Sequence, residues 1–465
     1  MKTLATLLIA VAFMSPAISA ERPNVLLIAI DDLNDWVGCL SGHPDARSPN
    51  IDRLAARGVL FTNAHCQAPI CNPSRTSIMY GLRPSTSGVY DNTIDPWNVP
   101  ALAQRVTLPR YFAAHGYRTL TAGKVYHDSG MPADDFQVVG PVPGQRTSHD
   151  RRLVPETPDG ARGLWDFGPQ TYDDTLFPDH ADATWAIEQL QDPSDKPFFL
   201  AIGFYRPHVP LYAPARYFDE IPESQVALPA VKQDDVADLP SITKKLIASR
   251  YSPPHEWFVR TGNWRKAVHA YLACVRFTDE QVGRLLDAVD ASRHATNTIV
   301  VLYSDHGFFL GEKNHWAKQS LWERATRVPL IIAGPGITPR QTCQRPVELL
   351  AIYPTLAELC GLPPRGDLDG TSLVPLLTDP DAAWSRPAIT THGRNNHAIR
   401  SDRHRFIRYR DGSEELYDHA SDPHEWTNIA GLPEHAGLVR SLAEFLPTHN
   451  AEPARPRSQK HGNKK

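Results

Sequence analysis

Residues 24–30 read NVLLIAI and end directly before Asp31 and Asp32. A run with almost no polar residue is typical of a strand that is buried on both faces of a parallel sheet. Three further runs have this character, at residues 198–202 (FFLAI), 297–303 (NTIVVLY) and 328–333 (VPLIIA). Helical periodicity alternates with them, at residues 50–57, 108–115, 181–190 and 267–289. The sequence therefore predicts an α/β fold in which helices flank a large mixed, mostly parallel, doubly wound sheet.

The C-terminal part has a different pattern. Residues 403–410 alternate basic with apolar or aromatic side chains, and the Asp411-Gly412 pair predicts a tight turn into a return strand. Residues at the extreme C-terminus lack apolar periodicity. The predicted units are a main domain at residues 21–375, a small α+β subdomain with an antiparallel sheet at residues 376–450, and a loose basic tail at residues 451–465.

The composition excludes two broad classes of protein. The 465 residues contain 48 Lys and Arg against 52 Asp and Glu, which gives a formal net charge of −4. Without an excess of cations the chain lacks what general nucleic-acid binders use to displace counterions. With 41% hydrophobic and 22% charged residues, the chain is also too apolar to be fully disordered. We therefore expect a large globular protein that does not bind nucleic acid.

The first twenty residues have the features of a secretory signal peptide. Lys2 supplies the positive start, and residues 4–14 (LATLLIAVAFM) form an apolar run that is too short for a stable membrane span. Cleavage is expected after Ser19 or Ala20, and no cysteine follows there to carry a lipid anchor. No later segment reaches transmembrane length. The protein is therefore expected to be secreted or periplasmic, without a membrane anchor.

Six cysteines are scattered along the chain, at positions 39, 66, 71, 274, 343 and 360. No two of them have the two-residue gap of a zinc knuckle. In an oxidising compartment six cysteines allow three disulfides, and five allow two if one cysteine is used for other chemistry. We expect Cys343 and Cys360 to form a disulfide.

Polar clusters follow three of the predicted strands. Asp31 and Asp32 follow the first strand, residues 205–208 (YRPH) the second and residues 304–307 (SDHG) the third. In doubly wound sheets, ligands bind beyond the carboxyl ends of the strands. The sequence therefore predicts a functional site at this edge of the sheet.

The most informative motif is the stretch from Cys71 to Gly81, CNPSRTSIMYG. Alone, a cysteine beside a proline turn has a purely structural interpretation. Here the motif follows residues 48–64 (SPNIDRLAARGVLFTNA) and the aspartate pair after the first strand. In this order the three elements resemble the type I, formylglycine-dependent sulfatases, and the resemblance covers nearly the whole mature chain. It implies an alkaline-phosphatase-like fold and a catalytic sulfatase domain at residues 21–375.

The resemblance implies that a formylglycine-generating enzyme oxidises Cys71 to formylglycine. One hydroxyl group of the hydrated aldehyde attacks sulfur, and the other later expels the sulfate. A site that handles an anionic ester needs a hard cation and fixed positive donors. Oxygens of Asp31, Asp32 and Asp305 suit Ca²⁺ or Mg²⁺, and the family uses one Ca²⁺. His306 and the formylglycine at position 71 are expected to complete the metal site.

The same resemblance assigns roles to five cationic or titratable residues. Arg75 lies one helical turn after the cysteine and is expected to orient the diol. Lys124, in GKVYH, is expected to contact the sulfate or the diol, and His127 to be the base that drives sulfate expulsion. His208, in RPHVP, is expected near the ester oxygen, and Lys318, in WAK, at the sulfate or leaving group. Taken singly, any of these residues is equally typical of a surface or a helix cap.

Four motifs, GKVYH, RPHVPL, SDHGFFLGE and HWAK, resemble the iduronate-2-sulfatase-like branch most closely. That branch removes sulfate from sugar rings of polyanionic glycans, so a sulfated glycan is the expected substrate. In the basic stretch at residues 394–410, we predict that Arg394, Asn396 and His397 contact the substrate. A solvated face of an exposed strand is the alternative for this stretch.

Two other functions remain open at this point. A phosphoester or phosphonate hydrolase on the same scaffold would need a similar site, because tetrahedral anions of sulfur and phosphorus are alike. A catalytically silent glycan-binding homologue would keep the fold while Cys71 stays a thiol. The sequence selects no particular glycan, ring position or oligomeric state.

Overall fold

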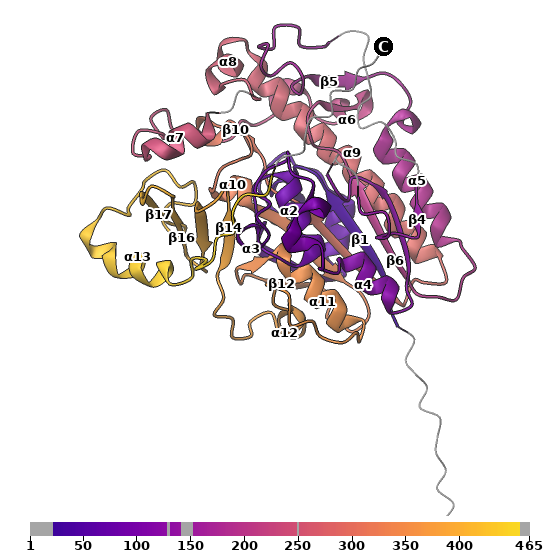
Figure 1. Ribbon diagram of the computed structural model, residues 1–465. Coiled ribbons are helices and arrows are strands. Elements are labelled where there is room, and N and C mark those ends of the chain that lie inside the picture. Colours follow the sequence, from indigo (N-terminus) through magenta and orange to yellow (C-terminus); the bar gives the residue numbers. More distant parts are fainter. Residues whose placement is uncertain (1–21, 128–130, 141–151, 249–250, 456–465) are drawn as a thin grey trace, which may run out of the picture.

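The computed structural model describes residues 22–127, 131–140, 152–248 and 251–455 (Figure 1). The expected signal peptide and residues 456–465 of the expected tail lie outside this part of the chain. Within it, a nine-stranded main sheet has the strand order β12 (Gln341–Cys343), β2 (Gly58–His65), β11 (Arg327–Ala333), β8 (Thr298–Ser304), β1 (Asn24–Ile30), β6 (Phe198–Phe204), β3 (Arg118–Gly123) and β4 (Val138–Val139), and β13 (Val347–Glu348) also pairs with β2.

The apolar runs of the sequence are central strands of this sheet. β1 lies between β6 and β8 and runs parallel to both, with Leu27 opposite Ala201 and Val301. β11 is antiparallel to β2 and β8, whereas the other neighbouring pairs are parallel. The prediction of a mixed, mostly parallel sheet is therefore confirmed.

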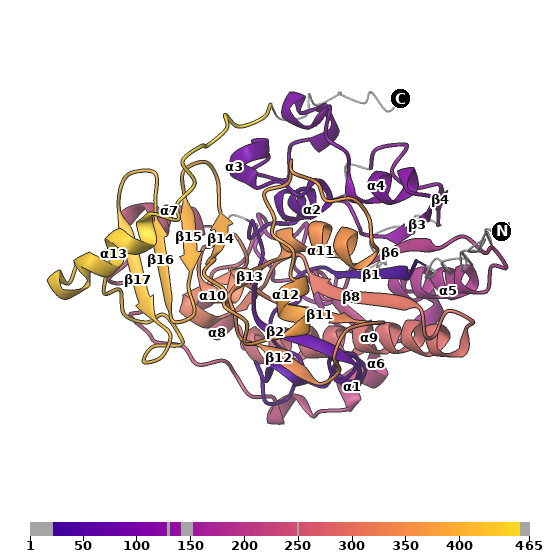
Figure 2. The same ribbon diagram turned by 90° about the horizontal axis from the view of Figure 1, so that it is seen from below.

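Helices cover both faces of the main sheet (Figure 2). Along β1, Leu26 and Ile28 face one apolar core while Val25 and Leu27 face the other, as the two-residue period of a strand requires. The first core includes residues of α1 (Pro49–Ala55), α5 (Pro178–Leu190), α6 (Ala215–Asp219), α8 (His255–Arg260) and α9 (Asn263–Ala291). The second includes residues of α2 (Cys71–Tyr80), α4 (Leu108–Ala114), α11 (Ile352–Leu359) and α12 (Val374–Thr378). The four predicted helices correspond to α1, α4, α5 and α9.

A second, antiparallel sheet lies beside the main sheet (Figures 1 and 2). It consists of β14 (Ala388–Thr391), β15 (His397–Arg400), β16 (His404–Arg408) and β17 (Glu414–Asp418), and α13 (Ala436–Ala443) packs on it. The predicted hairpin is the β16–β17 pair, with Gly412 at a φ of +86° in its turn. The expected boundary at residue 376 falls inside α12, whose Leu376 and Leu377 pack in the core of the main sheet.

Short elements connect these layers. β5 (Phe167–Gln170) pairs with β7 (Leu211–Pro214), and β9 (Phe309–Leu310) with β10 (Trp316–Ala317). The remaining helices are α3 (Pro84–Ser87), α7 (Ser241–Ile247) and α10 (Glu323–Thr326). Among the described residues, no helix combines the length and the apolar character that crossing a bilayer requires.

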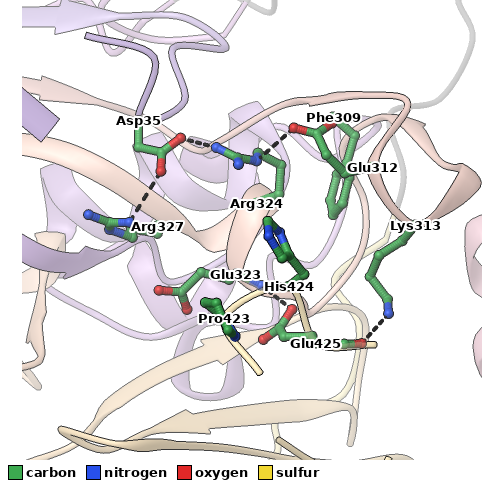
Figure 3. A pocket seen from close by; sticks show the side chains of 10 residues that line it. All are labelled: Asp35, Phe309, Glu312, Lys313, Glu323, Arg324, Arg327, Pro423, His424 and Glu425. Carbon is green, nitrogen blue, oxygen red and sulfur yellow. Dashed lines mark hydrogen bonds and ion pairs between the residues drawn. The ribbon is translucent and has the colours of Figure 1, made fainter. Parts of the chain in front are cut away.

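A charged junction joins the second sheet to the main domain, and we define it by Glu323, Arg400, Arg405 and Glu425. Glu323, on α10, and Glu425 line a small cavity that also contains the Asp35–Arg324 ion pair (Figure 3). Arg405, on β16, is fully buried, donates to Glu323 and lies 2.7 Å from Glu425. Arg400 Nε donates to Glu323 over 3.0 Å. The two sheets are therefore connected by buried, mutually neutralised charges.

Two expectations need correction. Cys343 and Cys360 form no disulfide, and all six cysteines are free. The sulfur of Cys343, on β12, faces the carbonyl of Pro380, while Cys360 lies at the end of α11. The distance between the two cysteines in the sequence allowed a disulfide, but the packing of β12 and α11 does not bring them together. The start of the tail is not loose, because the N–H groups of Ala451 and Ala454 donate to carbonyls at α3 and just beyond it.

We predict that Arg405→Met destabilises the protein by about 3–5 kcal/mol, because the buried Glu425 and the largely buried Glu323 lose the Arg405 guanidinium, and Arg400 remains for Glu323 alone. Chemical denaturation of the purified protein measures this change. Arg403→Met is the matched control, since the Arg403 side chain is 60% exposed and its ion pair with Asp418 lies at the surface. The control is expected to change stability by less than about 1 kcal/mol. Equal effects of the two substitutions would contradict a structural role for the charged junction.

Candidate active site

The three predicted polar clusters, together with the segment that carries Lys124 and His127, follow four neighbouring strands at their carboxyl ends. In the order β8, β1, β6 and β3, these strands run parallel and lie side by side. Their carboxyl ends therefore lie at one edge of the sheet, and the loops that leave them converge there. The loops carry, in the same order, Asp305 and His306, Asp31 and Asp32, His208, and Lys124 and His127.

Cys71 is the first residue of α2 and lies within this group of loops. It is buried, and its sulfur lies 3.1 Å from Lys318 Nζ and 3.3 Å from His306 Nε2. Burial is the main reason that the pKa of its thiol rises to about 12. An unmodified Cys71 would therefore be almost entirely protonated near neutral pH and a poor nucleophile.

Three buried carboxylates at this edge each face one buried cation, in the pairs Asp31–Lys124, Asp32–Lys318 and Asp305–Arg75. The Asp32–Lys318 contact is 2.6 Å, and the Asp305–Arg75 contact is 2.8 Å. Arg75 Nη2 also lies 3.5 Å from Asp31 Oδ1, so the guanidinium bridges two of the carboxylates. The charges of the three acids and the three cations balance, which is what makes their joint burial tolerable.

The pKa directions follow from burial and from these partners. Burial alone would raise the pKa of Asp31, but the charges of Lys124, Arg75 and Lys318 hold it well below its ordinary value. The pKa of Asp32 is raised, because burial and the neighbouring Asp31 outweigh Lys318. Burial would lower the pKa of Lys318, but Asp32 raises it well above its ordinary value.

Two histidines complete the inner site as neutral groups. Burial lowers the pKa of His306, and burial together with Lys318 and Lys124 lowers that of His208 well below its ordinary value. His306 Nδ1 lies 3.0 Å from the carbonyl of Gly307. When Nδ1 carries the proton and donates to that carbonyl, the lone pair of Nε2 faces Cys71.

Four of these residues have donor atoms close enough to share one metal ion. One donor each from Asp31, Asp32, Cys71 and His306 lies within 4.8 Å of the others. Asp31 Oδ1 and Asp32 Oδ2 are buried and make no hydrogen bond within the described residues, so each has a lone pair for a cation. Asp305, which we also predicted as a ligand, accepts from Arg75 and from the N–H groups of Asp32 and His306. The aspartates supply the oxygen ligands that Ca²⁺ prefers, and position 71 would supply one only as the expected formylglycine.

A cavity of about 400 Å³ opens onto this cluster. Five of the predicted site residues line it: Asp32, Lys124, His127, His208 and Lys318. The cavity is also lined by Ile70, Tyr90, Asp91, Asn92, Thr93, Leu164, Trp165, Tyr205, Val209, Tyr251, Ser252, Phe308, Ala317, Gln319 and His392. Apart from the charged cluster, the cavity wall is therefore mainly aromatic, aliphatic and neutral polar.

The residues predicted to contact substrate from the C-terminal part do not line this cavity. Arg394 pairs with Glu452, the Asn396 side chain holds its own turn, and His397 Nδ1 lies 2.9 Å from a threonine hydroxyl. His392, which the sequence interpretation missed, lines the cavity instead. The only feature of the sequence that could have indicated His392 is its position directly after a strand. That strand, β14 (AITT), is too short and too polar to be recognised from apolar periodicity.

Comparison with known proteins decides the family. A family model described as Sulfatase matches residues 23–362, and one described as N-sulphoglucosamine sulphohydrolase, C-terminal, matches residues 311–452. A protein of Formosa agariphila named "Sulfatase" is 43% identical over 443 residues, which cover 93% of this chain and 87% of that protein. The chain belongs to the sulfatase family. This membership confirms the expected family and the expected enzyme class, a sulfuric ester hydrolase.

Two further similarities extend this result. The iduronate 2-sulfatase of Homo sapiens is 34% identical over 397 residues, which cover 75% of this chain and 71% of that protein. The phosphonate monoester hydrolase of Agrobacterium radiobacter superposes with a TM-score of 0.75 at 23% identity and covers 91% of this chain and 94% of its own. The structural likeness confirms the fold class of this sulfatase, including the alkaline-phosphatase-like architecture.

We predict that Arg75→Met lowers turnover of 4-nitrophenyl sulfate by at least about 100-fold, because a buried positive donor beside the nucleophile position is lost. It will also lower thermal stability, since Asp31 and Asp305 lose their shared guanidinium. Arg57→Met, which removes an exposed ion pair with Asp290, is the control and is expected to leave turnover unchanged. Turnover of the Arg75 variant within a few-fold of the wild type would contradict this role.

Proposed function

We propose that this sulfatase hydrolyses sulfate esters of sulfated carbohydrates, in the manner of iduronate 2-sulfatase, with one Ca²⁺ and a formylglycine made from Cys71. The single observation that carries the proposal is the geometry around Cys71. Its sulfur lies beside Lys318 and His306, at a cavity and next to buried carboxylates. Without these groups the cavity would offer neither a position for a nucleophile nor ligands for a metal ion.

The ligand chemistry supports the calcium part of the proposal. Asp31, Asp32, Asp305, His306 and the side chain at position 71 would hold the ion, and Asp305 also accepts hydrogen bonds from the N–H groups of Asp32 and His306. A bound Ca²⁺ would draw the anionic sulfate into the site and polarise its oxygens. Because the acids and cations of the cluster balance each other, the ion would leave the site positive and ready for an anion.

The high pKa of the Cys71 thiol supports the modification. Because burial raises the pKa of this thiol, the unmodified cysteine would be a weak nucleophile near neutral pH. Conversion to formylglycine would supply a hydrated aldehyde, whose hydroxyl group is the family's nucleophile. A formylglycine-generating enzyme is therefore the maturation partner that we propose.

The other predicted site residues would bind and orient the sulfate ester. Lys124 and Lys318 each carry an ammonium group at the cavity surface and would bind sulfate oxygens. Arg75 is anchored on two carboxylates, so it fixes their positions and orients the group at position 71. His208 lies 3.8 Å from Asp32 and lines the cavity, where its neutral ring would meet the ester oxygen. His127 also lines the cavity and would take up the proton released when sulfate leaves.

Several observations support a sugar substrate and export. The matched relatives include iduronate 2-sulfatases, and aromatic residues such as Tyr90, Tyr205 and Trp165 line the cavity, as is common where proteins bind sugar rings. The signal-like residues 1–20 support a secreted or periplasmic location. For the domains we propose a catalytic unit at residues 21–378, which moves the expected boundary at residue 375 to the end of α12, and a C-terminal subdomain that follows it to residue 450.

We predict that the purified, matured protein hydrolyses 4-nitrophenyl sulfate faster than 4-nitrophenyl phosphate, and that Cys71→Ala abolishes both activities without unfolding the protein. The nucleophile position is a small side chain, so its loss removes chemistry rather than packing. Cys39→Ala, which removes a half-buried thiol elsewhere, is the control and is expected to stay fully active. A strong preference for the phosphate ester would instead identify a phosphoester hydrolase on the same fold.

We further predict that Ca²⁺ raises the melting temperature of the wild-type protein and that EDTA reverses the rise. Asp31→Asn is expected to remove the response, because a proposed ligand charge is lost. Asp290→Asn, at an exposed ion pair, is the control and should respond as the wild type does. A calcium response that persists in the Asp31 variant would contradict the proposed metal site.

A further inference from the structure

The second sheet contributes one side chain to the wall of the active-site cavity. His392 directly follows β14 and lines the same cavity as His127, Lys124 and Lys318. The remaining described residues of that wall come from the main domain. His392 is therefore the point at which the C-terminal subdomain reaches the substrate side of the site.

The backbone around His392 is fixed by a short hydrogen-bonded turn. The N–H of His392 donates to the carbonyl of Asn396 over 3.0 Å, and the Asn396 side-chain amide donates back to the carbonyl of His392 over 2.8 Å. The N–H of Arg410, beyond β16, donates to Asn396 Oδ1 over 3.0 Å. Gly393 adopts a φ of +69°, which the turn requires and which other residues rarely adopt. The imidazole is therefore presented to the cavity from a rigid support.

The same turn anchors the cavity rim that carries Tyr90. Arg394, two residues after His392, lies 2.7 Å from the carboxylate of Glu452. The Tyr90 hydroxyl donates a hydrogen bond to the carbonyl of Ala451, the neighbour of Glu452, over 3.0 Å. His392 and Tyr90 thus belong to two cavity-wall segments that are tied together through the C-terminal segment.

The imidazole of His392 has unused hydrogen-bonding capacity. Its Nδ1 is buried and has no hydrogen-bond partner among the described residues. Burial, with a smaller contribution from His315, lowers the pKa of His392 to about 4, so the ring is neutral at pH 7 and offers one donor and one acceptor. Buried polar atoms of folded proteins are normally paired, so an unpaired imidazole nitrogen beside a cavity calls for a partner such as water or a ligand.

We propose that His392 is a specificity-determining residue that hydrogen-bonds a hydroxyl group of the sulfated sugar, beyond the sulfate ester itself. The inference rests on the proposed function, because it names the part of the substrate, beyond the sulfate ester, that the cavity wall would recognise. A neutral imidazole in a cavity wall that also contains aromatic side chains matches an uncharged, hydroxyl-bearing sugar face. The charged cluster binds the sulfate group, and His392 of the C-terminal subdomain discriminates among the sugar rings that carry this group.

The test compares two kinds of ester. 4-Nitrophenyl sulfate has no sugar hydroxyl, whereas a panel of monosulfated glucose, galactose, N-acetylglucosamine and a 2-O-sulfated uronic acid disaccharide supplies the sugar substrates. We expect His392→Ala to lower kcat/KM for the best sugar sulfate by about 10-fold and to leave that for 4-nitrophenyl sulfate within about 2-fold. His392→Gln, which keeps a donor and an acceptor, is expected to recover part of the loss.

His404→Ala is the matched control, because His404 lies on β16 of the same sheet, contacts Asp418 and does not line the cavity. It is expected to change neither substrate's kinetics, and unchanged turnover of 4-nitrophenyl sulfate also reports that each variant is folded. An equal loss on both kinds of ester, or no loss on the sugar, would overturn the role of His392. A wild-type enzyme that hydrolyses the aryl ester but none of the sugars would overturn it too, while one that hydrolyses no sulfate ester would overturn the proposed function itself.

Discussion

The site depends on the burial of three carboxylates at the carboxyl ends of adjacent strands. Asp31, Asp32 and Asp305 follow strands that are buried on both faces, so these acids leave water when the sheet forms. An isolated buried carboxylate would cost several kcal/mol, and only close positive partners offset that cost. The surrounding cations are therefore required by the fold as well as by the chemistry.

This constraint links distant parts of the chain into one site. Arg75, on α2, reaches two of the acids and so holds the helix that begins at Cys71 against the strand ends. Lys318, from the loop after β10, contacts both Asp32 and the cysteine sulfur. A second set of buried charges, around Arg405, attaches the C-terminal sheet whose turn carries His392 into the cavity. Charge neutralisation thus fixes the nucleophile position and the cavity wall together.

The sequence predicted the sheet and the inner site better than the cavity wall. Continuous apolar runs identified the central strands, and motif order identified Cys71 and its cationic neighbours, because both signals are local. β3, which reads RTLTAG, was missed because its threonines break the apolar run. The substrate contact was placed on Arg394 because charge suggested it, whereas tertiary packing pairs Arg394 with Glu452 and turns His392 into the cavity. Such pairings join residues far apart in the chain, and no local pattern encodes them.

The proposed chemistry requires an aldehyde, made from Cys71, at the nucleophile position of this sulfatase. The most direct measurement is the mass of the tryptic peptide spanning residues 58–75, taken from protein with measured sulfatase turnover. We expect a peptide in which the thiol-bearing group of residue 71 is replaced by an aldehyde, while Cys66 in the same peptide stays a thiol. Full turnover by protein whose residue 71 is entirely unmodified cysteine would contradict it.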